Sequence, residues 1–156
     1  MDFARADALN QAIRLLSLRH RARAAELLAP LGLHPGQEAL LLELARTGPM
    51  IQAELSEALG VERPSVTLMV RKLEAAGHLR RSPAPDDQRA TVVELTGKGE
   101  ALAERVKELW CALAEETVAG LPDETVADLP ALLGVLTNNV DTKRPRRREN
   151  AQRGRR

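Results

Sequence analysis

Apolar side chains recur along most of this chain at the spacing of an α-helix. In residues 3–29 they lie three, four or seven positions apart, on one stripe of a single long helix that Pro30 ends. Pro35 favours the start of the next helix, GQEALLLELART, which is apolar around most of its circumference and is therefore expected to be buried. The stripe of the first helix consists of Leu9, Ile13, Leu16, His20 and Leu27.

Two short helices with a tight turn between them are predicted next. The first, QAELSEAL, ends at Gly60, because glycine readily adopts the left-handed conformation that follows a helix. The second begins near Pro64 and runs to Ala76, where Gly77 ends it. Two helices joined by such a short glycine-containing turn are a helix-turn-helix signature. The inward side of the second helix is expected to consist of Val66, Met69, Val70 and Leu73.

Two runs rich in Val, Thr and Arg follow and predict a β-hairpin. They are HLRRS and ATVVEL, and in the second run Thr91, Val93 and Leu95 alternate onto one face. The loop between them, SPAPDDQ, contains prolines and aspartates, which disfavour continued strand. TGPM, before QAELSEAL, is expected to be only a turn. A basic hairpin directly after a helix-turn-helix supplies a second element that can reach a DNA duplex.

The last third of the ordered sequence predicts two long helices. Thr96 can cap a helix that runs to about Ala119, and a final helix covers about Asp123 to Val140. Pro130 lies inside the final helix, so we expect a kink or a break there. The apolar stripes are Leu102, Val106, Leu109 and Leu113 in the first of these helices, and Leu129, Leu133, Leu136 and Val140 in the second.

Composition and charge fit one domain with a basic tail. The 156 residues carry a net charge of +1, but residues 141–156 carry +6 (8 basic, 2 acidic) and residues 1–140 carry −5 (15 basic, 20 acidic). Residues 63–89 are locally +3 (6 basic, 3 acidic). The tail has no apolar pattern and is expected to be disordered. No apolar run approaches the length of a membrane span and no signal peptide is evident, so we expect a cytoplasmic protein.

The outward face of the second short helix suits a nucleic-acid surface. Hydroxyl groups can bind phosphates or base edges, leucine can contact a thymine methyl, and arginine can bind guanine with two hydrogen bonds. Arg63 lies at the helix start, where the positive end of the helix dipole favours phosphate. The alternative is a charged face that is merely solvated. The outward residues are Ser65, Thr67, Leu68, Arg71 and Lys72.

The segment from Gln52 to Gly99, QAELSEALGVERPSVTLMVRKLEAAGHLRRSPAPDDQRATVVELTGKG, resembles the MarR family of winged-helix transcriptional regulators. The hairpin's DDQR matches the family's Asp-x-Arg element as Asp87 and Arg89, and LTGKG matches the opening of the following helix. The resemblance implies a mainly α fold with a small β wing in a single domain, residues 1–140. Within it, a winged helix-turn-helix (34–96) is flanked by N- and C-terminal dimerisation helices (3–29 and 97–140), and a disordered basic tail (141–156) follows.

The resemblance also implies a function and a role for each matching residue. It points to a homodimeric DNA-binding regulator, a repressor released by a small-molecule effector, and not to an enzyme. Arg89 is expected in or beside the minor groove, whose negative potential attracts arginine, and Asp87 is expected to brace the wing by pairing with arginine. The predicted DNA-binding residues are Arg63, Ser65, Thr67, Leu68, Arg71, Lys72, Arg81, Asp87 and Arg89.

Four positions depart from the family pattern. The family often has a basic residue where Leu68 stands, an acid in place of Arg71, a hydroxyl cap in place of Ile51, and a second arginine in place of Gln88. These departures bear on the choice of base sequence rather than on DNA binding itself.

The apolar stripes of the first and the last two helices predict a homodimer. They are too broad for one small winged-helix unit to cover, whereas interlocked terminal helices of two copies can bury them. A two-fold dimer spaces two recognition helices by about 34 Å, one turn of DNA, and therefore predicts an inverted-repeat operator in double-stranded DNA. The alternative is a monomeric bundle that packs the stripes internally.

An effector site, a metal site and a redox site are weighed separately. Arg14 can pair with a carboxylate, so Arg14 and His20 are candidates for binding a small anionic or phenolic ligand; the alternative is an ordinary surface arginine and an interface histidine. Cys111 lies among carboxylates on neighbouring turns, which argues against a reactive thiolate. No cofactor is expected, and no metal-ligand spacing is present.

Two other functions remain open from the residues alone. The winged helix can serve as a protein-interaction or dimerisation module without sequence-specific DNA binding, in which case its arginines are incidental. An enzyme using Glu104 or Glu108 in a helix crevice is the third reading, but these two glutamates look like a solvated face.

Overall fold

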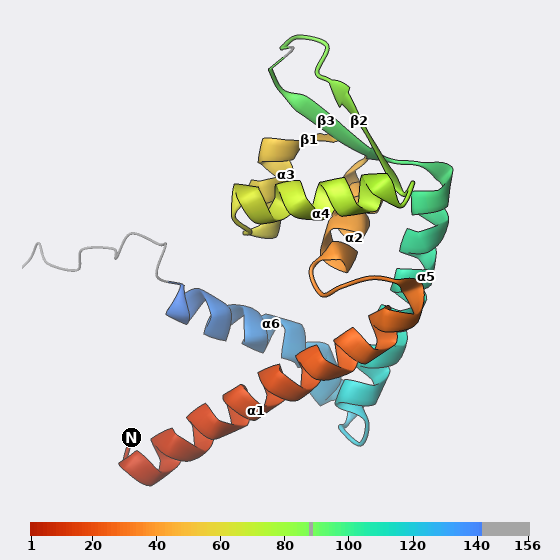
Figure 1. The fold of residues 1–156 in the computed structure, drawn as a ribbon. Helices are drawn as coiled ribbons and strands as arrows, with labels where there is room; N and C mark the ends of the chain where they lie inside the picture. Colours follow the sequence, from red (N-terminus) through yellow and green to blue (C-terminus); the bar gives the residue numbers. More distant parts are fainter. Residues whose placement is uncertain (88, 142–156) are drawn as a thin grey trace, which may run out of the picture. The chain divides into compact units, whose positions relative to one another are not determined.

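The computed structural model describes residues 1–87 and 89–141, and the described part is mainly helical with one small sheet (Figure 1). The chain divides into two compact units, Met1–Thr117 and the residues from Val118 onward. None of the described helices is long and apolar enough to cross a membrane. The elements are α1 (Phe3–Leu28), the 3-10 helix η1 (Ala29–Leu31), α2 (Gln37–Thr47), β1 (Met50–Ile51), α3 (Gln52–Leu59), α4 (Arg63–Ala75), β2 (Leu79–Pro83), β3 (Thr91–Leu95), α5 (Gly97–Val118) and α6 (Asp123–Val140).

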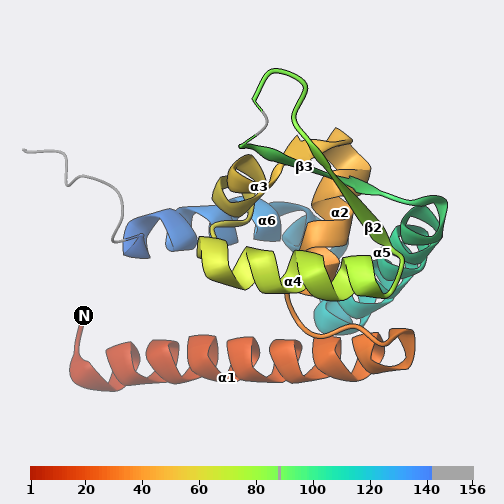
Figure 2. The same ribbon diagram turned by 45° about the horizontal axis from the view of Figure 1, so that its top comes forward.

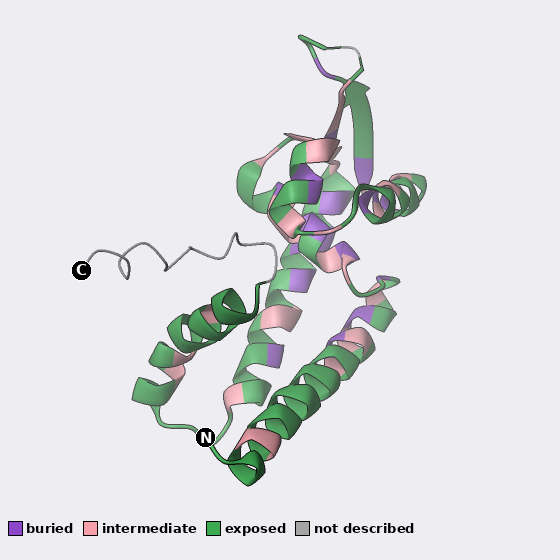
Figure 3. Ribbon diagram, turned by 90° about the vertical axis from the view of Figure 1, so that its left-hand side faces the viewer, coloured by how far each residue is buried: buried purple, intermediate pink, exposed green. Residues whose placement is uncertain are grey.

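The core of the first unit lies between α2, α3, α4, the sheet and the N-terminal half of α5. Figure 3 shows the buried residues gathered there, whereas most of α1 is exposed. The inward side predicted for α4 is confirmed, since Val66, Val70 and Leu73 are buried and Met69 packs against them. The core consists of Leu28, Leu33, Leu40, Leu41, Leu44, Leu55, Val66, Val70, Leu73, Leu79, Val93, Leu102, Ala103 and Val106.

The sheet has three antiparallel strands in the order β1-β3-β2. The predicted hairpin is confirmed as β2 and β3, with Leu79 opposite Leu95 and Pro83 opposite Thr91. The expectation that TGPM is only a turn is wrong at its last residue, because Met50 and Ile51 pair with Val93 and Val92. A two-residue strand is too short to show the alternation that marks longer strands in a sequence.

The start of α2 also differs from the prediction. Gly36 adopts a left-handed conformation (φ 100°), so the helix begins at Gln37 and not at Pro35. The Gln37 side chain then closes the turn, because its Oε1 accepts a hydrogen bond from the backbone N–H of His34 at 2.9 Å. Pro35 therefore belongs to a turn that precedes the helix.

Thr96 caps α5 as predicted, because its Oγ1 accepts a hydrogen bond from the N–H of Gly99 at 3.1 Å. The same hydroxyl donates to the backbone oxygen of Gly77 at 2.7 Å. Lys98 Nζ donates to the oxygen of Ala76 at 2.9 Å. The first turn of α5 is thereby fixed to the turn that follows α4.

The second unit contains α6, which runs without interruption from Asp123 to Val140. Of the kink or break expected at Pro130, the break is wrong, since a proline removes one backbone hydrogen bond but the turns on either side can continue the helix, and the kink stays a prediction. The expected disorder of the basic tail falls on residues 142–156, which lie outside the described residues.

Candidate nucleic-acid interface

Helix α4 presents its polar side away from the core. Its amphipathic sequence buries Val66 and Val70, which leaves Ser65, Arg71 and Lys72 exposed on the other faces. Leu68 is also 56% exposed, although it is apolar and large. An exposed leucine between hydroxyl and cationic side chains suits a surface that contacts both thymine methyl groups and polar edges.

The wing stands beside α4, so the two elements form one face of the first unit (Figure 2). The cations on this face fall into two groups. Arg63, Arg71, Lys72 and Arg89 form no ion pair with any residue in the described part of the chain, whereas Arg80 and Arg81 are both paired. The unpaired four are available to a polyanion without first losing an internal partner.

Arg81 is held by Glu74, near the C-terminal end of α4. Its Nε donates to Glu74 Oε2 at 2.8 Å, and its Nη2 lies 2.5 Å from the same oxygen. These hydrogen bonds lower the pKa of Glu74 and raise that of Arg81, so both groups stay charged. Arg81 was predicted to contact DNA directly, but its guanidinium already binds Glu74 and would have to bind DNA at the same time.

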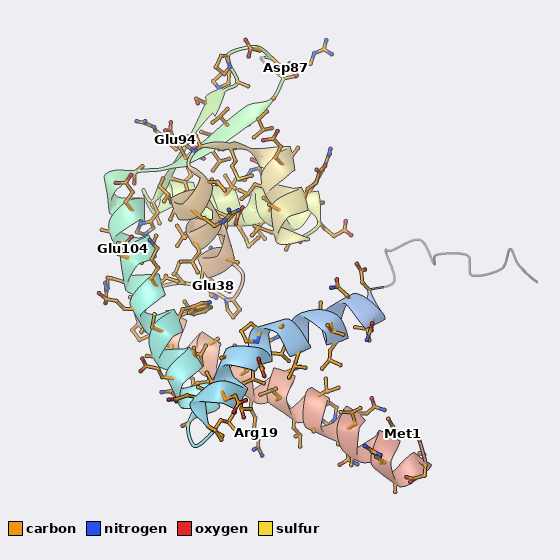
Figure 4. All side chains as sticks on the ribbon, turned by 180° about the vertical axis from the view of Figure 1, so that it is seen from behind. Met1, Arg19, Glu38, Asp87, Glu94 and Glu104 are labelled. Carbon is orange, nitrogen blue, oxygen red and sulfur yellow. The ribbon has the colours of Figure 1, made fainter. Side chains whose placement is uncertain are left out.

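Arg80 points to the other side of β2 and pairs across the hairpin. Its Nε donates to Glu94 Oε1 at 2.6 Å, and the two residues are register partners of β2 and β3. This pair lowers the pKa of Glu94, which Figure 4 shows at the base of the wing. The pair therefore ties the two wing strands together.

Thr67 was expected to contact phosphates or bases, but its hydroxyl is used inside the fold. Thr67 Oγ1 donates to the backbone oxygen of Arg63 at 2.9 Å and accepts from Gln52 Nε2 at 2.8 Å. Its only proton is thus committed, and the hydroxyl fastens the start of α3 to the start of α4.

Asp87 braces the wing in a different way from the one expected. In place of an arginine side chain, its Oδ1 accepts a hydrogen bond from the backbone N–H of Arg89 at 2.9 Å, and within the described residues its carboxylate makes no ion pair. A carboxylate two positions before an N–H closes a tight loop by this local bond. Asp87 lies in the loop at the tip of the wing (Figure 4). The Arg89 side chain forms no ion pair with any residue that the structure describes.

An open hollow of about 390 Å³ lies where the starts of α3 and α4 meet the wing. Two of the unpaired arginines, Arg63 and Arg89, border it from different elements. The N-terminal end of α3 also faces it, with no side chain capping that helix. The hollow is lined by Ile51, Gln52, Ala53, Arg63, Thr67, Asp87, Arg89, Ala90 and Thr91.

Sequence reasoning missed Gln52 and Glu74 as parts of this face. Gln52 meets Thr67 across 15 positions and Glu74 meets Arg81 across 7, and in each pair the two residues lie on different elements, so the period of one helix or strand does not relate them. Only the packing of α4 against α3 and β2 brings the partners together. The sequence holds one signal for Glu74. It is an acid near the end of a predicted helix, followed by an arginine in the next predicted strand.

The residues predicted for other sites lie apart from this hollow. Arg14 and His20 are both exposed on α1, and Cys111 is exposed on α5. Glu104 pairs with Lys107 at 2.6 Å. Among the described residues, no cluster of histidine, cysteine and carboxylate side chains could hold a metal ion.

Comparison with known proteins agrees with this geometry. A sequence model of the MarR family matches residues 33–91. The HTH-type transcriptional regulator YwoH of Bacillus subtilis, itself uncharacterised, is 34% identical over 116 residues, which cover 74% of this chain and 81% of YwoH.

Solved structures show the same fold. A mutant MarR from E. coli complexed with operator DNA is 28% identical, with a TM-score of 0.76 over 87% of this chain and 99% of that one. A probable transcriptional regulator from Pseudomonas aeruginosa is also 28% identical, with a TM-score of 0.74 over 82% of this chain and 96% of that one. The chain therefore belongs to the MarR family of winged helix-turn-helix transcriptional regulators, which are not enzymes.

Proposed function

We propose that this protein binds double-stranded DNA as a homodimer and represses transcription until a small molecule releases it. The observation that carries the proposal is the set of four unpaired cations on α4, its start and the wing, two of which border one hollow. The E. coli relative with the same fold is complexed with operator DNA, which supports the same use of this face.

Each element has a distinct task in this mechanism. Helix α4 enters the major groove, where Arg71 and Leu68 reach base edges and Ser65 and Lys72 reach base edges or phosphates. Arg63, beside the hollow, binds backbone phosphate. Arg89 enters or follows the minor groove, whose narrow stretches attract arginine. Two copies related by a two-fold axis place two such faces on an inverted-repeat operator, and the protein acts in the cytoplasm.

Release by a ligand is the regulatory part of the proposal. Arg14 and His20 on α1 are the candidates for a small anionic or phenolic effector, because a guanidinium can bind a carboxylate with two hydrogen bonds. Both side chains are exposed in the single chain and are therefore open to a ligand or to a second copy.

Charge reversal tests the proposal against a winged helix used only for protein interaction. Arg71→Glu and Arg89→Glu should each abolish retention of the gene's own upstream DNA in a gel-shift experiment. Arg105→Glu, on the exposed side of α5, is the matched control and should retain binding. If both interface variants still bound the upstream DNA at low salt, the proposal that this face binds DNA would be wrong. Addition of candidate phenolic acids to the wild-type complex tests the release step.

A further inference from the structure

The link between Glu74 and Arg81 joins the recognition helix to the wing through side chains. One carboxylate oxygen receives both Nε and Nη2 of the guanidinium, and each side chain is only about one third exposed. Two donors of one guanidinium on one carboxylate oxygen define the relative orientation of the two side chains more closely than a single contact does.

Strand alternation explains why Arg81, and not Arg80, makes this link. Arg81 lies two positions after the buried Leu79 and therefore faces the same side of the sheet, toward α4. Glu74 follows the buried Leu73 on α4. The two charged residues thus lie just outside the apolar contact that packs β2 on α4.

Backbone hydrogen bonds hold the wing at two places, at the turn after α4 and along β1, which pairs with β3 at Val92 and Val93. The turn after α4 is held by hydrogen bonds from Gly77 N to Glu74 O at 2.8 Å and from His78 N to Leu73 O at 2.9 Å. Beyond Leu79 the remaining residues of β2 are exposed, and the Arg80–Glu94 pair acts only within the hairpin. β1 supports the β3 side of the wing, and the side-chain link from Arg81 ties the β2 side to α4 at the same level.

We propose that Glu74 and Arg81 are positioning residues that set the angle between the wing and α4, and that Arg81 does not itself bind DNA. This inference rests on the proposed function. The angle matters because Arg89 and the residues of α4 must contact the same duplex. Fixing that angle before binding removes an entropic cost from association.

Neutralising Glu74 separates this role from simple electrostatics. Glu74→Gln removes a negative charge from a face that binds a polyanion, so charge alone predicts tighter DNA binding. The positioning role predicts weaker binding, by about twofold to thirtyfold for a dimer, because an ion pair of this exposure contributes up to about fivefold in each protomer. Glu62→Gln is the matched control and should bind tighter, because it removes an exposed carboxylate at the start of α4 that forms no ion pair within the described part of the chain.

A charge swap and the salt dependence test the same role from the side of Arg81. The double variant Glu74→Arg with Arg81→Glu has the net charge of the wild type and should bind the upstream duplex with close to wild-type affinity, whereas an affinity as low as that of Arg81→Glu alone would show that Arg81 itself contacts DNA. Arg81→Met should weaken binding without changing the slope of affinity against salt, whereas Arg63→Met should reduce that slope by about one for each lost phosphate contact.

A distance measurement on free protein keeps this inference separate from DNA binding. Spin labels at Lys72→Cys and Asp86→Cys, in a Cys111→Ser background, report the separation of α4 and the wing tip. Glu74→Gln should broaden the distance distribution and the charge swap should narrow it again. An unchanged distribution overturns the positioning role even if DNA binds, and wild-type protein that ignores DNA overturns only the proposed function.

Discussion

The backbone of Gly99 passes so close to His78 that a Cβ atom on Gly99 would lie 2.0 Å from the His78 carbonyl oxygen. That oxygen also accepts a hydrogen bond from Thr96 N at 3.0 Å. The first turn of α5 is therefore docked on the turn between α4 and β2, and glycine is what permits the approach. This contact joins the helix predicted to form the dimer to the two elements proposed to bind DNA.

Gly99→Ala should destabilise the protein strongly. The new methyl group cannot be accommodated without moving backbone, and overpacking of this kind costs about 1–3 kcal/mol or more. Urea unfolding at fixed protein concentration measures the effect. Gly97→Ala is the matched control, since a Cβ there meets nothing within 4 Å and alanine favours helix. Equal stability of the two variants would show that the docked turn can move freely.

Thr67→Val should lower the free energy of unfolding by about 1 kcal/mol. The variant keeps the shape of the side chain but loses the hydrogen bonds to Gln52 and to the Arg63 oxygen, and a hydrogen bond typically contributes about that much. Ser65→Ala, two positions earlier on the exposed face, should change stability far less and should instead weaken DNA binding. The opposite pattern, with Thr67→Val affecting only DNA binding, would support the DNA contact that the sequence predicts for Thr67.

Glu38→Gln should flatten the dependence of stability on pH. Burial raises the pKa of Glu38 above its ordinary value of 4.5, although Gly36 N donates to its Oε2 at 2.6 Å. The folded state then holds this proton more tightly than the unfolded state, so stability falls as pH rises from 4.5 through the raised value. Urea unfolding in buffers across this range should show a steeper decline for the wild type. Parallel curves for the two proteins would contradict it.

Local patterns were enough to predict most of the fold. The ends of α3 and α4 follow from Gly60, Pro64 and Gly77, whose backbone preferences act within a few residues. The strand β1 was missed because its two residues carry no period of their own; β3 alone makes them a strand. The break considered at Pro130 does not occur, because the turns on either side of a proline can continue the helix.

The sequence predicts which residues of the candidate site are exposed on one face, but not which of them bind one another. Its arginines could be located because the helix and strand periods say which residues point outward. Which of them already have partners depends on contacts between elements, as in the pair of Glu74 with Arg81. The same holds for Thr67, whose partner Gln52 lies on another helix.

Leu16→Glu should break the proposed homodimer. Leu16 is 51% exposed in the single chain, on the stripe that also carries Leu9 and Ile13. Burying a leucine side chain contributes about 1.5–3 kcal/mol, and a two-fold interface contains it twice, so the dimer dissociation constant should rise by at least about a hundredfold. Sedimentation across a dilution series measures it. Leu18→Glu is the matched control, because Leu18 is 59% exposed but lies on the opposite side of α1. A Leu16→Glu protein that stays dimeric on dilution would place the interface on another surface.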